Sequence, residues 1–288
     1  MAIREFLLRR VRWAEHSNAH RKSDADTNTP ILIGGFYRSG TTLLRRLLDA
    51  HPAVHCPPEL KFMRNVLGEY SDDPYGHLRF FNACRVLPLD EPERLAVWGR
   101  AYAELRARAA ERIGKRRWAD KDPENARYLP QWEQALSTGF VYVHLIRDPL
   151  DTLASVREMG FEKSLPPVLT EQVARWRANG EAALQFFAYA PERGYCLSYE
   201  SLVERPQATL GGLLDWLGLD DDGTLVRGLN DPARGRGLED PKIDQTSGIH
   251  SESFGRGARE LDPESRVFIR REVDEVYEAL SAFAATRL

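Results

Sequence analysis

The sequence has little cysteine and no long hydrophobic run. Its three cysteines, Cys56, Cys84 and Cys196, lie far apart and form no C-x-x-C pair. A sparse, odd set is typical of free thiols in a reducing compartment and argues against a disulfide-stabilised domain. No apolar run approaches the roughly 18 residues that a membrane-spanning helix needs, and the N-terminus carries no signal-peptide core. We therefore expect a cytoplasmic protein without a membrane span.

An excess of charge of one sign is also lacking. The chain has 288 residues, with 40 Lys and Arg against 43 Asp and Glu, and the formal net charge is −3. This balance gives no overall attraction to nucleic acid, although it leaves room for a local basic pocket. The length and the 42% hydrophobic content suit one large soluble domain with insertions.

Residues 1–29 are predicted to form a helix followed by a linker. Between Ile3 and His16 the apolar residues, among them Phe6 and Val11, share one helical face, and the arginines lie largely elsewhere. We expect this helix to pack against the domain or against a partner chain, so a homodimer is open. Contact with a membrane surface is the alternative. Residues 17–29 are polar and are interpreted as a linker to a single domain that spans 30–288.

Strand, polar loop and helix follow one another repeatedly along that domain. This alternation predicts an α/β fold with a central parallel sheet flanked by helices. Ligands on such sheets bind beyond the carboxyl ends of the strands, where the polar loops lie. A mostly helical insertion is expected at about 61–114, an irregular stretch at 230–262 and a final amphipathic helix at 264–287. The predicted strands are 30–36, 117–119, 140–146 and 195–198, and further helices follow the first strand, residue 122, residue 148 and residue 205.

The helix of the second unit has a clear start signal. A short strand through Trp118 and Ala119 leads into a polar loop that contains Lys121. Asp122 fits the N-cap of the next helix, and Pro123 fits its first position.

The loop after the first strand has the spacing of a nucleotide P-loop, G-x-x-x-x-G-K-[ST], between Gly35 and Thr42. Two glycines let backbone N–H groups point inward, and the following helix N-terminus adds partial positive charge. Thr41 occupies the place of the usual lysine, and Arg38 supplies a cation from inside the loop instead. A loop without that lysine is poorly suited to transfer of the ATP γ-phosphate. It suits a shorter anion bound without metal.

A second anion-binding motif follows the strongest strand signal. Arg147 stands at the strand end, and Ser155 lies further along the next helix, so the two could hold a second phosphate. Two alternatives stay open. Arg147 could merely pair with a carboxylate, or Asp148 could be a magnesium-binding aspartate. The arginine between the strand and Asp148 argues against the magnesium site, and we predict no metal.

Both segments resemble sulfotransferases that use PAPS (3′-phosphoadenylyl sulfate). Residues 34–44, Gly-Gly-Phe-Tyr-Arg-Ser-Gly-Thr-Thr-Leu-Leu, resemble the 5′-phosphosulfate loop of this family, and residues 143–155 resemble its 3′-phosphate motif. Matches at 49–52, 120–123, 198–202 and 253–256 are closer to the tyrosylprotein branch than to the cytosolic phenol and steroid branch. The resemblance runs from about Ile31 to the C-terminus and is weakest in the helical insertion. It implies a P-loop-type three-layer fold and PAPS as the donor, with PAP (adenosine 3′,5′-bisphosphate) as product.

The resemblance also implies which residues bind the donor. Arg38 and the amides that follow it would hold the 5′-phosphosulfate, and Arg147 with Ser155 would hold the 3′-phosphate. Tyr199 would touch the adenine, and Ser253 and Arg256 would close over the 3′-phosphate. The full expected set is Arg38, Ser39, Gly40, Thr41, Thr42, Arg147, Ser155, Tyr199, Ser253 and Arg256.

For catalysis, the resemblance places Glu59 as the general base, with Lys121 and Arg38 beside the transferring sulfate. His51 and His55 are rival bases from the same run of residues. Lys61 stands where the tyrosylprotein branch has an arginine, which puts its contact with the acceptor in doubt.

The leading hypothesis is therefore sulfuryl transfer from PAPS to a hydroxyl of an unidentified acceptor. Because the chain has no membrane anchor, a carbohydrate or small metabolite is favoured over a secretory protein. A P-loop kinase or NTPase is one alternative, and Thr41 in the lysine position argues against it. A non-catalytic nucleotide-binding protein is the other, and the presence of both Glu59 and Lys121 argues against that.

Overall fold

The computed structural model describes residues 28–67, 78–159, 165–220, 223, 225 and 253–286. The predicted N-terminal helix and nearly all of the linker lie outside these residues, as does most of the irregular stretch at 230–262.

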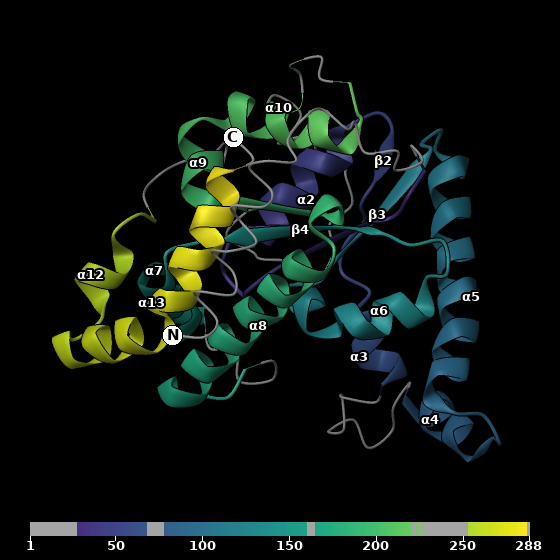
Figure 1. Cartoon of the computed structure of the whole chain (residues 1–288), viewed down its shortest axis with the longest axis horizontal. Coiled ribbons are helices and arrows are strands. Elements are labelled where there is room, and N and C mark those ends of the chain that lie inside the picture. Colours follow the sequence, from purple (N-terminus) through teal and green to yellow (C-terminus); the bar gives the residue numbers. More distant parts are fainter. Residues whose placement is uncertain are drawn as a thin grey trace.

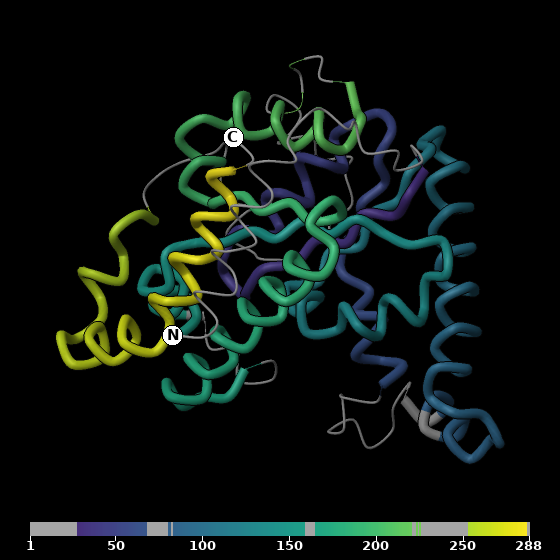
Figure 2. The backbone as a smooth tube through the Cα atoms, in the orientation of Figure 1, coloured from purple at the N-terminus to yellow at the C-terminus, as the bar shows by residue number. Residues whose placement is uncertain are grey.

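The described chain is built on a five-stranded sheet in the order β2-β3-β1-β4-β5. Every pairing is parallel, and β1 runs between β3 and β4 (Figure 2). The three-layer α/β prediction is confirmed. The strands are β1 (Ile31–Gly35), β2 (Val54–His55), β3 (Arg117–Lys121), β4 (Val141–Ile146) and β5 (Gly194–Ser198).

Helices cover both faces of the sheet because successive strand residues point to opposite sides. Leu32 and Cys196 belong to a core with α6 (Leu129–Ala135), α8 (Leu169–Tyr189) and α13 (Pro263–Ala285). Ile33 and Val143 belong to a second core with α2 (Thr41–Ala50), α9 (Tyr199–Glu204) and α10 (Pro206–Leu217). In Figure 1, α8 and α13 cross one face of the sheet.

The predicted helical insertion is confirmed in its described part. It contains α3 (Phe62–Val66), α4 (Leu78–Ala83), a 3-10 helix (Cys84–Val86) and α5 (Glu91–Arg112). Asp90 caps α5 and forms a reciprocal capping box with Glu93. The inner side of α5 packs on α6 and β3 at the β2 edge of the sheet (Figure 1).

The helix start predicted at Asp122 is wrong. β3 runs on through Asp120 and Lys121, so Asp122 lies in a turn, where its Oδ1 accepts a hydrogen bond from the Glu124 amide at 3.0 Å. A 3-10 helix follows at Asn125–Tyr128, and α6 begins at Leu129. Helix α8 was not predicted.

Two helices lie next to each other after β4. Helix α7 (Pro149–Met159) begins where it was expected, and a short helix α12 (Arg256–Glu260) packs on it. Among the helices in the described part of the chain, none is long and apolar enough to cross a membrane.

Candidate active site

The P-loop is shaped by close backbone packing at the end of β1. A Cβ on Gly35 would lie 2.6 Å from the carbonyl oxygen of Leu145, so only glycine fits there. Ser39 closes the turn, since its Oγ accepts from the Phe36 amide at 3.1 Å and donates to the Phe36 carbonyl at 2.7 Å. Gly40 (φ 94°) then starts α2, whose free N–H groups face the loop.

Arg38 and Arg147 come together on one side of this loop. Arg38 donates through Nε to the Ser155 hydroxyl at 3.1 Å. Arg147 donates to the carbonyls of Arg38 and Ser253, each at 2.9 Å, and its guanidinium lies 4.7 Å from the centre of the Tyr199 ring. The Tyr199 and Ser253 hydroxyls lie 3.1 Å apart. Five residues that the sequence predicted for the donor site therefore meet at the ends of β1, β4 and β5.

The Nε group of Arg147 is available to a ligand. The Arg147 side chain is buried, and its Nε has no hydrogen-bond partner among the residues that the structure describes. Burial lowers the pKa of this guanidinium from its ordinary value. An unpaired donor on a buried cation is costly, and an anion placed against it removes the cost. The residues present therefore fit a bound phosphate.

Lys121 and Glu59 form an ion pair beside the P-loop helix. Lys121 has a buried side chain at the end of β3 and donates to the Thr42 hydroxyl at 3.1 Å. The same ammonium group is hydrogen-bonded to the Glu59 carboxylate, and Lys61 lies 3.7 Å from its other oxygen. An accessible carboxylate thus stands beside a lysine that touches the P-loop helix.

The two rival histidines are used structurally. His51 is buried, and its Nδ1 accepts from the Ala53 amide at 3.0 Å, which leaves Nε2 to donate to the Asp220 carbonyl at 2.8 Å. His55 lies 3.6 Å from Asp49. Burial alone would raise the pKa of Asp49, but the nearby His55 and the hydrogen bond from the Cys56 amide lower it to about 2. Neither imidazole is placed against the P-loop by these contacts.

Asp148 is occupied by structural contacts. Its Oδ1 caps α7 through the amides of Leu150 and Asp151, and its Oδ2 lies 2.6 Å from Arg270. These contacts disfavour the magnesium-aspartate alternative. Within the described ranges no cluster of three or more His, Cys, Asp or Glu side chains could hold a metal.

Arg256 differs from the other predicted donor residues. It pairs with Glu158 of α7 and Glu260 of its own helix, each at 2.8 Å. Neither partner is a predicted site residue. The structure does not bring the Arg256 guanidinium into contact with Arg147 or Tyr199.

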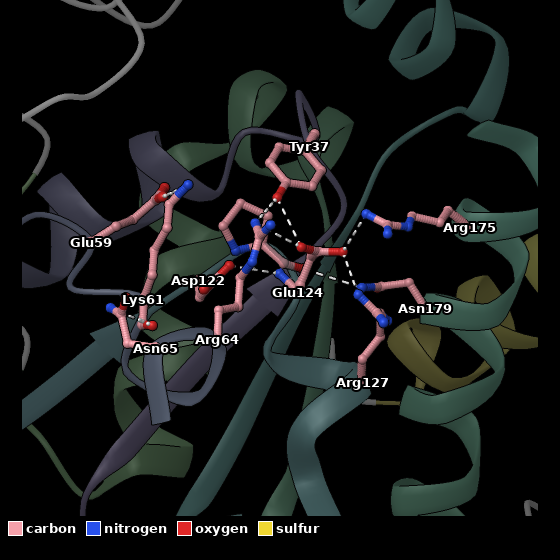
Figure 3. A network of polar contacts seen from close by, with 11 residues as sticks. Tyr37, Glu59, Lys61, Arg64, Asn65, Asp122, Glu124, Arg127, Arg175 and Asn179 are labelled. Carbon is pink, nitrogen blue, oxygen red and sulfur yellow. Dashed lines mark hydrogen bonds and ion pairs between the residues drawn. The ribbon is translucent and has the colours of Figure 1, made fainter. Parts of the chain in front are cut away.

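One buried acidic residue was missed by the sequence analysis. Glu124 accepts from the P-loop residue Tyr37 and pairs with three arginines (Figure 3). Its local sequence gave no signal, because a glutamate after proline was expected in the exposed first turn of a helix.

Comparison with known sequences decides the family. The sequence model described as "Sulfotransferase family" matches residues 30–223. The chain belongs to the sulfotransferase family. The chain is 27% identical over 195 residues to a candidate protein-tyrosine sulfotransferase of Caenorhabditis briggsae, covering 66% of this chain and 65% of that protein. It is 26% identical over 246 residues to the nodulation protein NoeE of Sinorhizobium fredii, covering 77% of this chain and 54% of NoeE. The chain thus spans about half to two thirds of the length of these relatives.

Two solved structures have the same fold as this chain. The sulfotransferase domain of the Synechococcus PCC 7002 olefin synthase aligns with a TM-score of 0.65 at 22% identity, covering 92% of this chain and 98% of that domain. The sulfotransferase domain of the curacin biosynthetic pathway aligns with a TM-score of 0.62 at 22% identity, covering 86% and 97%. At this identity the likeness establishes the fold.

Proposed function

We propose that this protein transfers the sulfuryl group of PAPS to a hydroxyl of an acceptor. The observation that carries the proposal is the buried Nε of Arg147, which no described residue hydrogen-bonds, beside a P-loop in which Thr41 stands at the usual lysine position and Arg38 supplies a cation. Two separate cationic positions suit a donor with both a 5′-phosphosulfate and a 3′-phosphate. Membership of the sulfotransferase family supports the same donor.

In this reaction the bond between sulfur and the bridging phosphate oxygen breaks, and a bond from sulfur to the acceptor oxygen forms. Arg38 and the α2 amides would hold the phosphosulfate, and Lys121 would stabilise the charge that develops on the leaving oxygen. Glu59 would take the proton from the acceptor hydroxyl. Its place beside Lys121, which itself touches Thr42, supports this role.

Donor identity is tested by thermal stabilisation. We expect PAP to raise the melting temperature of the protein well above the effect of ADP with magnesium at equal concentration, because only PAP has the 3′-phosphate that Arg147 would bind. Equal stabilisation by the two nucleotides, or a larger effect of ADP, would overturn the assignment of PAPS.

The base is tested by Glu59→Gln. We expect this variant to bind PAP as the parent does and to lose turnover by on the order of 100-fold or more. Glu278→Gln, at an exposed position on α13, is the matched control and should keep full turnover. Undiminished turnover in Glu59→Gln would remove this residue from the role.

The acceptor and the compartment belong to the same proposal. The free thiols of Cys56, Cys84 and Cys196 support a reducing compartment such as the cytoplasm, and a carbohydrate or small hydroxylated metabolite is the acceptor we favour. A screen with labelled PAPS against sugars, small metabolites and tyrosine peptides tests this choice. Transfer to the peptides alone would contradict it.

A further inference from the structure

Glu124 is a buried carboxylate that contacts four side chains, one from the P-loop and three from helices (Figure 3). It is 1% exposed. Its Oε2 accepts from the Tyr37 hydroxyl at 2.9 Å and lies 3.0 Å from Nη1 of Arg64. Its Oε1 lies 2.7 Å from Arg127 and 3.3 Å from Arg175. Charge-assisted contacts of this number hold a buried carboxylate in one place.

The two oxygens of this carboxylate serve different parts of the molecule. Oε2 contacts Tyr37, which belongs to the P-loop, and Arg64, which belongs to α3. Arg64 also donates to the Tyr37 hydroxyl at 2.8 Å, so the two segments are joined directly as well. Oε1 contacts Arg127 on the 3-10 helix after β3 and Arg175 on α8, which carry none of the proposed catalytic groups.

Each segment held by Oε2 lies beside an unusual backbone turn. Tyr37 precedes Arg38, whose φ is 66°, and Arg64 lies three residues after Lys61, whose φ is 50°. Residues other than glycine rarely adopt positive φ, and they keep it only where the surrounding structure holds them. The first turn directs Arg38 toward Ser155, and the second leads from Glu59 into α3.

The backbone next to Glu124 is anchored to the same loop. The carbonyl of Pro123 accepts from the Gly35 amide at 3.3 Å and from the Asn179 side chain at 3.2 Å. Burial, followed by the nearby Glu124 charge, raises the pKa of Tyr37, so its hydroxyl stays a neutral donor to the carboxylate. Glu124 is therefore fixed relative to the P-loop through both its backbone and its side chain.

We infer that Glu124 is a positioning residue that sets the P-loop turn at Arg38 and the turn before α3 relative to one another, and so places the donor cation and the base Glu59 together. This inference rests on the proposed function. It separates the network into an active half, Tyr37 and Arg64 on Oε2, and a scaffold half, Arg127 and Arg175 on Oε1.

Substitutions in the active half can be compared with matched substitutions in the scaffold half of the Glu124 network. Tyr37→Phe and Arg64→Met each remove one contact to Oε2, and Arg127→Met and Arg175→Met each remove one contact to Oε1. Because a displacement of about 1 Å in a reacting group costs up to about 100-fold in rate, we expect kcat of Arg64→Met to fall on the order of 10- to 100-fold. PAP affinity of that variant should stay within about threefold, since the donor-binding residues are untouched.

Tyr37→Phe should act on the donor side instead. We expect its KM for PAPS and its Kd for PAP to rise by on the order of tenfold, with a smaller change in kcat, because the released turn carries Arg38. Arg127→Met and Arg175→Met should lower the melting temperature and leave kcat and both KM values within about twofold of the parent when assayed below that temperature.

Arg64→Lys and Glu124→Gln keep the test decisive if Arg64→Met does not fold. Arg64→Lys should recover part of the lost kcat, because it retains a cation next to Oε2, whereas Glu124→Gln should show both the kcat and the KM defects. Equal losses of kcat in Arg127→Met and Arg64→Lys, or parent kinetics in Glu124→Gln, would overturn the inference. A parent protein that neither binds PAP nor turns over PAPS would instead refute the proposed function.

Discussion

Asp122→Asn should make the protein more stable at neutral pH. Asp122 is buried beside Glu59 and Glu124, and burial, with the Glu59 charge next in size, raises its pKa from 3.8 to about 7. Its folded pKa therefore lies above its unfolded pKa. The folded protein keeps this proton between about pH 4 and pH 7 while the unfolded chain loses it, so stability falls as the pH rises through that window.

The magnitude follows from the size of the shift. Each pKa unit corresponds to about 1.4 kcal/mol, so the shift from 3.8 to about 7 costs about 4 kcal/mol once Asp122 is ionised. Asparagine is neutral at every pH and can still accept the Glu124 amide through its side-chain oxygen. The gain in unfolding free energy should therefore be near zero at about pH 4 and should approach 4 kcal/mol above about pH 7.

His144 makes the pH profile a sharper test. Burial lowers its pKa from 6.5 to about 3, so between these pH values the unfolded chain is protonated at His144 and the folded protein is not. The contribution of His144 to the free energy of unfolding rises with pH between about 3 and 6.5. It opposes the contribution of Asp122 over the pH range that the two share. The free energy of unfolding of the parent should therefore stay nearly constant from about pH 4 to 6.5. In Asp122→Asn the same free energy should rise by about 3 kcal/mol over this range.

The measurement is urea unfolding at half-unit intervals from pH 4.5 to 7.5, with the midpoint and slope fitted separately. Asp215→Asn, at an exposed position on α10, is the matched control and should not change the shape of the profile. A stability difference between Asp122→Asn and the parent that is the same at every pH would refute the reasoning.

Three further changes test the donor site and the catalytic side. Arg147→Lys should raise the Kd for PAP by about tenfold or more in calorimetry, because lysine lacks Nε and the planar fork; unchanged affinity would remove Arg147 from the 3′-phosphate site. Gly40→Ala should cost about 1–3 kcal/mol in unfolding experiments, since Gly40 has φ 94° and an added Cβ would lie 2.4 Å from the Tyr199 ring. A neutral result there would mean that the loop differs from this geometry. Lys121→Met should lower kcat by about 100-fold with PAP affinity nearly retained, and normal turnover in steady-state assays would exclude Lys121 from leaving-group stabilisation.

Local patterns in the sequence were sufficient to predict the strands and the P-loop on the donor side of the molecule. Buried strands read as continuous apolar runs, and β1, β4 and β5 were predicted to within a residue of their bounds. The P-loop and Arg147 were recognisable because an anion site of this kind is built from adjacent residues at strand ends. The structure brings together five of the residues predicted for this site, namely Arg38, Ser155, Arg147, Tyr199 and Ser253.

Other features could not be predicted locally. Asp122 and Pro123 carry a standard helix-start signal, yet β3 pairs with β1 as far as Lys121 and leaves Asp122 in a buried turn. Propensity at a helix start is worth about 1 kcal/mol, which is less than the strand pairing and burial that compete with it. The partners of His51 and Arg256 likewise come from segments distant in the sequence or from an adjoining helix.

The sequence by itself therefore determined the α/β class and the position of the P-loop, since these depend on periodicity and on residues close together in the chain. Only the tertiary structure decided which charged side chains meet. Lys121 and Glu59 lie 62 positions apart, and Tyr37 and Glu124 lie 87 apart. Such pairs form because β3 inserts beside β1 in the sheet and the helical insertion returns over its end, and no local pattern encodes that closure.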